Sequence, residues 1–219
     1  MGSCPGTTRK GCACRNPRSR ERPGGWCGKC IAPVPTTALQ PVAALRQQAL
    51  SLGPADLEGA SAAAWDYLAS NGGPAPAGPV VLHLSSGEEV TVDPTHLDDL
   101  EGPWAQAYLR GHCFDLAVAL HGLTGAALVG VVDKDMADRC PNGVKHVGVM
   151  VEEGLMLDIE GPDTDLSSIG DDDPAVSWRL LTADDVAALA SARGPERNVP
   201  LARLVAERLL DSHFEDWRP

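Results

Sequence analysis

The 219-residue chain lacks long apolar runs, internal repeats and a recognisable secretion signal. No run of 18 apolar residues occurs, so the sequence predicts no membrane-spanning helix. The segment after Met1 lacks the apolar core of a signal peptide, which favours a cytoplasmic location. Apolar residues still make up 43% of the chain. The sequence can therefore bury a sizeable core and form one domain with an appendage.

Basic residues are scarce except at the N-terminus. The net charge is −12, yet residues 1–30 hold seven basic residues against Glu21 alone and carry +6. The remaining residues therefore carry −18. Such an acidic body is expected to repel nucleic acid, whereas the basic arm has the charge to attract it. Docking of the arm on its own acidic body is the alternative.

The cysteine pattern predicts a small zinc module. Five of the seven cysteines lie in residues 1–30, which have almost no aliphatic side chains to build a core. In a reducing compartment, metal binding or catalysis is expected of these thiols before disulfides. Two close pairs can supply the four tetrahedral ligands of Zn²⁺, with Cys4 as an alternative ligand and a metal-free tail as the alternative structure. The predicted ligands are Cys12, Cys14, Cys27 and Cys30.

We divide the chain into a basic, cysteine-rich arm with its proline-containing linker, residues 1–35, and a larger domain, residues 36–219. The arm is expected to contact a protein partner or phosphate groups. Stacking on nucleic-acid bases is poorly supported, because Trp26 is the only aromatic residue of the arm.

The larger domain has the pattern of an α+β fold. Apolar spacing and turn residues indicate helices over 36–51, 56–70, 113–123 and 182–192, and a last helix through 201–209. Alternating or apolar runs indicate strands over 80–84, 89–92, 128–132, 144–151, 155–159 and 176–181. A short acidic helix is expected after Pro94, and the aspartates between 163 and 173 are expected in a solvated loop. Helices followed by a small antiparallel sheet and closing helices are typical of this class.

Cys113 is the candidate nucleophile. It stands where an apolar helix pattern begins, and a helix N-terminus favours the thiolate over the thiol. His146 and Asp158 follow on successive strand-like runs. This order is that of a nucleophile with its base and the group that orients the base.

Turn chemistry supports a contact between His146 and Asp158. A three-residue loop, 152–154, would end in Gly154, which suits a left-handed backbone. In this register His146 and Asp158 share a face as diagonal neighbours, roughly 7–8 Å apart at the backbone. Glu160 would lie opposite His146 and is a rival orienter. The expected pairs are Val151 with Leu155 and Gly148 with Asp158.

The expected roles follow from this layout. His146 would take the proton of Cys113 or form a thiolate–imidazolium pair with it, and Asp158 would hold the ring. The backbone N–H of Cys113 would donate to a developing oxyanion. A second donor is needed, and the candidates are His112, Gln106 and Trp104.

Gly111-His112-Cys113 stands at a helix start, His146 precedes alternating valines, and Leu157-Asp158 lies on the next strand. Together these three features resemble the papain-like superfamily, and most closely its transglutaminase-like and arylamine-acyltransferase-like branches. The resemblance covers roughly residues 104–161. It implies a papain-like core, with the cysteine helix on a small antiparallel sheet, and acyl transfer through a thioester without a catalytic cofactor. Peptidase or deamidase action on an amide or isopeptide bond of a protein or peptide is the implied activity.

The alternative function is a zinc-bearing interaction module on an inactive scaffold, with possible nucleic-acid contact.

The remaining cysteine and histidines of the larger domain are weaker candidates for a catalytic role. Cys140 lies in a polar loop, and His83, His96 and His213 have no partner pattern. His121 shares the helix of Cys113 but lies about 80° around it, which makes it a weaker base candidate.

Overall fold

The computed structural model describes residues 56–214 except 153, 170–172, 174 and 193–197. All of them belong to the compact unit Pro41–Pro219. The helix expected over 36–51 lies outside the described residues. So do the predicted zinc ligands, Cys12, Cys14, Cys27 and Cys30.

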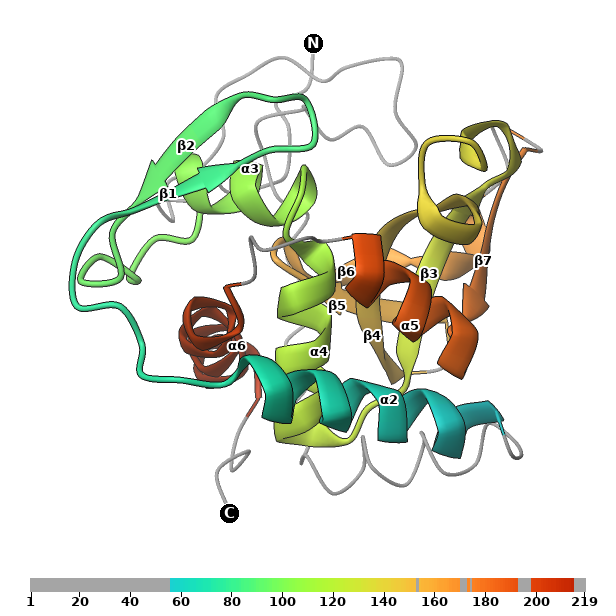
Figure 1. The fold of residues 1–219 in the computed structure, drawn as a ribbon, viewed down its shortest axis with the longest axis horizontal. Helices are drawn as coiled ribbons and strands as arrows, with labels where there is room; N and C mark the ends of the chain where they lie inside the picture. The colour runs from blue at the N-terminus through green and yellow to red at the C-terminus, as the bar shows by residue number, and fades with distance from the viewer. Residues whose placement is uncertain (1–55, 153, 170–172, 174, 193–197, 215–219) are drawn as a thin grey trace, which may run out of the picture. The chain divides into compact units, whose positions relative to one another are not determined.

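The described residues combine helices with antiparallel sheets, which confirms the α+β prediction (Figure 1). The helices are α2 (Asp56–Asn71), α3 (Pro103–Leu109), α4 (Cys113–Thr124), α5 (Ala183–Ala192) and α6 (Val199–His213). The strands are β1 (Val80–His83), β2 (Glu89–Val92), β3 (Leu128–Asp133), β4 (Val144–Glu152), β5 (Leu155–Asp158), β6 (Gly161–Asp165) and β7 (Val176–Leu180). Short 3-10 turns are η2 (Lys134–Met136), η3 (Pro141–Gly143) and η4 (Leu166–Ser168). Among the described residues, no helix is long and apolar enough to cross a bilayer.

Five strands form one sheet in the order β6-β5-β4-β3-β7, and β1 and β2, both predicted as strands, form a separate hairpin. Strand β6 was not predicted, because its acidic residues indicate a loop. An edge strand pairs on one side only, so its main chain can bond to β5 while the side chain of Asp165 stays exposed. The helix expected after Pro94 is also wrong, since residues 94–102 are not helical.

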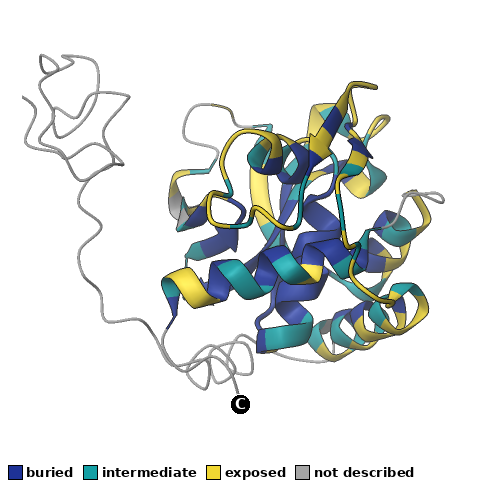
Figure 2. Cartoon of the chain, turned by 90° about the vertical axis from the view of Figure 1, so that its left-hand side faces the viewer, coloured by how far each residue is buried: buried dark blue, intermediate teal, exposed yellow. Residues whose placement is uncertain are grey.

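Both faces of the large sheet bury apolar side chains, because alternate strand residues point to opposite faces. Val147, Val149 and Leu157 join the main core, while Met150 and Met156 join a smaller cluster. Each fully buried side chain of this size contributes about 1.5–3 kcal/mol. Figure 2 shows burial concentrated where helices and sheet pack, with the connecting loops exposed.

Helix α4 is buried on nearly all sides. It packs against α2, α6 and β4, and only Gly122 and Leu123 of its twelve residues are not buried. An apolar surface all round is typical of a central helix. The helix ends where the backbone of Gly125 becomes left-handed, with φ 72°, as the sequence predicts. This packing fixes the position of Cys113 at its first turn.

The β4–β5 hairpin keeps the predicted register through an unpredicted bulge. Val149 pairs with Leu157, as the expected register requires, but Leu155 pairs with Glu152 and not with Val151. The connection has two residues, ending in Gly154 with φ 83°. A two-residue loop alone would reverse which residues share a face. The bulge adds back the missing residue and restores the expected alternation.

Candidate active site

Cys113 is the first residue of α4, with His112 at the N-cap. Only 9% of Cys113 is exposed. The apolar residues that follow Cys113 are buried in the core, and Cys113 itself lines a surface cleft. Partial positive charge at this end stabilises a thiolate relative to a thiol.

His146 and Asp158 are in contact. The Nε2 atom of His146 lies 2.7 Å from Oδ2 of Asp158, whose other oxygen accepts a hydrogen bond from the backbone N–H of Glu160 at 2.9 Å. Asp158 is 4% exposed, whereas Glu160 is exposed. Of the two carboxylates that the sequence leaves open, Asp158 is therefore the one that contacts the ring.

His146 also hydrogen-bonds the side chain of Cys113. Because Nε2 faces Asp158, Nδ1 is the ring nitrogen left for the sulfur. Burial lowers the pKa of His146, but the hydrogen bonds to Asp158 and Cys113 raise it to about 10. The ring is then positively charged at neutral pH, and it can stabilise a thiolate on one side while a carboxylate holds the other. The structure brings together the three residues that the sequence selects.

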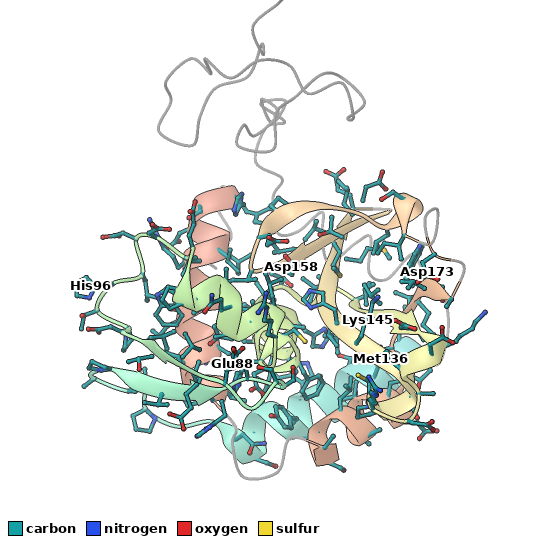
Figure 3. The ribbon with its side chains drawn as sticks, turned by 90° about the horizontal axis from the view of Figure 1, so that it is seen from above. Glu88, His96, Met136, Lys145, Asp158 and Asp173 are labelled. Atoms are coloured by element: carbon teal, nitrogen blue, oxygen red, sulfur yellow. The ribbon has the colours of Figure 1, made fainter. Side chains whose placement is uncertain are left out.

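A cleft of about 340 Å³ lies over Cys113. The two residues that flank His146 on β4, Lys145 and Val147, also line it. Figure 3 shows Lys145 and Asp158 toward the middle of the described residues, with the exposed His96 at the periphery. A substrate in this cleft would meet the sulfur at its floor.

The cleft also includes two residues that the sequence analysis set aside. Cys140 and His83 both line it. His83 is exposed, and the β1–β2 hairpin brings it into the same cleft as Cys113. No local pattern indicates this proximity, since it depends on how the hairpin packs against the start of α4.

The three proposed side-chain oxyanion donors are not available at the sulfur. Nε2 of His112 donates to the carbonyl oxygen of His83 at 3.1 Å, and Nδ1 lies 3.4 Å from Asp115. The indole N–H of Trp104 donates to the carbonyl oxygen of His96 at 3.2 Å. Gln106 is exposed on α3 and is not among the described residues that line the cleft. The backbone N–H groups at the start of α4 remain as candidate donors to a developing oxyanion.

A buried polar network that the sequence analysis missed holds the start of α4. Asp115 is fully buried, accepts a hydrogen bond from the hydroxyl of Tyr67 at 2.6 Å and faces the ring of His112. A buried carboxylate is costly unless it is paired. The available signal was an aspartate between two apolar residues, Phe114 and Leu116, on the buried helix. Its role is to position the helix that carries the nucleophile.

One wall of the cleft is fixed by Asp185 on α5. Its backbone N–H and carboxylate bond reciprocally with Thr182, which forms a capping box at the start of α5. The same carboxylate bonds to Arg179 and to Asn142, whose 3-10 turn η3 borders the cleft. Burial raises the pKa of Asp185, but Arg179 and the other donors hold it well below its usual range.

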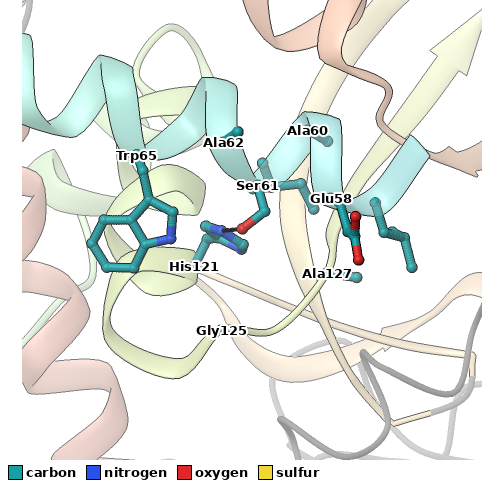
Figure 4. Close-up of a pocket in the computed structure, with 10 residues that line it drawn as sticks. Glu58, Ala60, Ser61, Ala62, Trp65, His121, Gly125 and Ala127 are labelled. Atoms are coloured by element: carbon teal, nitrogen blue, oxygen red, sulfur yellow. Dashed lines mark hydrogen bonds between the residues drawn. The ribbon is translucent and has the colours of Figure 1, made fainter. Parts of the chain in front are cut away.

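His121 occupies a different environment (Figure 4). Its Nδ1 donates to the carbonyl oxygen of Ala126 at 2.7 Å, so Nε2 accepts from the hydroxyl of Ser61 at 2.9 Å. Burial lowers the pKa of His121, and the hydrogen bond to Ala126 raises it only in part. The adjoining cavity of about 390 Å³ includes Trp65 and Leu128 but not Cys113. His121 is therefore not placed as the base for the thiol.

Among the described residues, no group of three or more histidine, cysteine or acidic side chains is arranged to hold a metal ion. Comparisons of the chain with protein-family models, curated proteins and solved structures find no significant match. The geometry of the site is accordingly the basis for its function.

Proposed function

We propose that this protein is a cysteine-dependent hydrolase or acyltransferase that acts on amide or isopeptide bonds through a thioester. The observation that carries the proposal is the hydrogen-bonded series from Cys113 to His146 to Asp158 beside a cleft. Hydrolysis, as a peptidase or deamidase, is favoured over transfer to another acceptor.

The proposed reaction has two stages. The thiolate of Cys113 attacks the amide carbon, and the carbonyl electrons move onto oxygen near the start of α4. The imidazolium of His146 gives its proton to the departing nitrogen as the C–N bond breaks, which leaves a thioester and an amine. Neutral His146 then takes a proton from water, whose oxygen attacks the thioester, and the acid and the thiolate are released.

Asp158 acts through His146 in this scheme. Its contact with Nε2 sets the ring orientation and stabilises the cationic form that the first stage needs. Water is excluded in part, because Cys113 and Asp158 are both buried. The lower effective dielectric strengthens the ion pair between sulfur and imidazolium.

A papain-like architecture is part of the proposal. It is supported by a nucleophile at the N-terminus of a central helix, by packing of that helix on an antiparallel sheet, and by a histidine and an aspartate on neighbouring strands. The zinc site of the arm, the partner that its charge would attract and a cytoplasmic location remain predictions from the sequence.

The test is a search for altered proteins rather than for one substrate. Lysate incubated with the full chain is analysed by mass spectrometry for cleavage, cross-links and the mass change of deamidation. We expect modified proteins with the wild type and none with Cys113→Ala. The matched control is Cys140→Ala, which removes the other thiol that lines the cleft. Equal modification by the wild type and Cys113→Ala would refute the proposed function.

A further inference from the structure

The cleft over Cys113 is positively charged in an acidic protein. Arg110, Arg139 and Lys145 line it, and its described lining residues include no aspartate or glutamate. Acidic residues outnumber lysine and arginine in the chain by 30 to 18. The lining of the cleft is therefore basic, although the chain as a whole is acidic.

The two arginines come from separate walls. Arg110 follows α3, and its carbonyl oxygen accepts hydrogen bonds from Ser85 in the β1–β2 loop. Arg139 lies between η2 and η3, after strand β3. Figure 1 shows the hairpin and the segment after β3 on opposite sides of the start of α4. An extended substrate that crosses the cleft would meet one arginine on each side of the sulfur.

These arginines differ from Lys145 in their pairing. The Nζ atom of Lys145 lies 3.5 Å from a carboxylate oxygen of Asp133, which neutralises part of its charge. Within the described part of the chain, neither Arg110 nor Arg139 has a carboxylate within ion-pair distance. Their guanidinium groups are left to bind an external anion, and the planar guanidinium matches a carboxylate in two parallel hydrogen bonds.

We propose that the substrate is an acidic peptide segment, with carboxylate side chains on both sides of the amide that Cys113 attacks. Arg110 and Arg139 bind these carboxylates and set the specificity. The inference rests on the proposed function, which supplies the amide bond. A nucleic acid fits less well, because no Trp, Tyr or Phe is among the described residues of the cleft to stack on a base.

The first experiment compares two reagents that alkylate a thiolate by the same chemistry, anionic iodoacetate and neutral iodoacetamide. Labelling of Cys113 in the full chain is followed by peptide mass spectrometry. We take the ratio of the iodoacetate rate to the iodoacetamide rate, because a change in the thiolate population affects both rates equally and cancels. We expect this ratio to fall about tenfold in Arg110→Gln/Arg139→Gln, and high ionic strength to reduce the wild-type ratio. The control is Arg203→Gln, an exposed arginine on α6 that does not line the cleft.

The outcomes separate the two proposals. Rapid labelling with a ratio that the arginine substitutions leave unchanged would overturn the acidic substrate and leave the nucleophile standing. Slow labelling of Cys113 by both reagents would overturn the proposed function and, with it, this inference.

The second experiment identifies the source of the anion. Peptidyl chloromethyl ketones that carry glutamate, glutamine or phosphoserine at the flanking positions are compared as inactivators. Faster inactivation by the glutamate peptide than by the glutamine peptide, lost in the double arginine variant, supports an acidic peptide. Equal rates for these two, or a clear preference for phosphoserine, would contradict it.

Discussion

The partly buried His146 and the buried His121 have opposite electrostatic environments. His146 lies between a carboxylate and a thiol, and its pKa is raised to about 10 against the lowering effect of burial. His121 lies between a hydroxyl and a carbonyl oxygen, and burial lowers its pKa. Burial alone favours neutral imidazole in both places. The partners therefore decide which ring is charged.

The surroundings of the two rings differ in the same way. The cleft beside His146 is lined by cationic side chains and two thiols, whereas the cavity beside His121 is mostly apolar. A neutral ring that joins α2 to α4 stabilises the packing of the helices. A charged ring beside a sulfur atom can transfer a proton. Four measurements test this distinction, from the largest expected effect to the smallest.

Removal of each imidazole should separate the two sites most strongly. We expect His146→Ala to slow alkylation of Cys113 by iodoacetamide at neutral pH about 100-fold, because the thiolate loses its cationic partner. His121→Ala should change this rate less than about twofold, since its ring bonds to Ser61 and Ala126 and not to Cys113. Similar rates for His146→Ala and the wild type would contradict a thiolate–imidazolium pair.

Substitution of Asp158 should lower the pKa of His146. In Asp158→Asn the carboxylate that stabilises the imidazolium is lost while burial remains, so we expect a fall of at least about one pH unit, measured by NMR titration. The matched control is Glu160→Gln, which removes the exposed neighbouring carboxylate and should leave the pKa near its wild-type value. An equal fall of the His146 pKa in both variants would show that Glu160 stabilises the charged ring as much as Asp158 does.

The stability of the protein should depend on pH with opposite signs at the two sites. The raised pKa of His146 stabilises the fold fully below pH 6.5, and this contribution is lost as pH rises through about 10. The lowered pKa of His121 gives a contribution that is present above pH 6.5 and is lost as pH falls below it. Each group contributes a slope of up to about 1.4 kcal/mol per pH unit within its window.

Denaturant unfolding of the wild type, His146→Gln and His121→Gln between pH 4 and pH 10 measures these slopes. The difference between the wild type and His146→Gln should shrink at alkaline pH, and the difference between the wild type and His121→Gln should shrink at acidic pH. If both differences shrink at the same end of the pH range, the two rings do not differ in charge as proposed.

The smallest effect is expected at Ser61. We expect Ser61→Ala to lower the free energy of unfolding by about 1 kcal/mol, because Nε2 of His121 loses its hydrogen-bond donor. Alkylation of Cys113 should be unchanged. The control is Ser191→Ala, an exposed serine on α5, whose loss should cost less than about 0.5 kcal/mol. A changed rate of Cys113 alkylation in Ser61→Ala would show that the two sites are coupled.

The features that follow from local patterns were predictable. Alternation of apolar residues in 80–92, with a turn between, predicts the β1–β2 hairpin, and Gly125 predicts the end of α4. Thr182 and Asp185 predict the cap of α5. In each case the residues that specify the feature are also the residues that form it, within a few positions of one another.

Features that depend on distant partners were not predictable. The bulge before Glu152 and the edge strand β6 depend on how neighbouring strands fit. The bond from Tyr67 to Asp115 joins residues 48 positions apart. His112 was one of three candidate oxyanion donors, and its ring faces Asp115 and the carbonyl oxygen of His83. Only the packing of the hairpin and α2 against the start of α4 places these partners.

The sequence by itself determined the order of the chemical groups: a thiol at a helix start, then an imidazole and a carboxylate on successive strands. Periodicity sufficed for this, because it reports which face of each element turns inward. The tertiary structure alone decided which carboxylate meets His146, which histidine is charged, and that Arg110 and Arg139 lie on two walls of one cleft. Charge acts through space over a few ångströms, and separation along the chain does not reveal those distances.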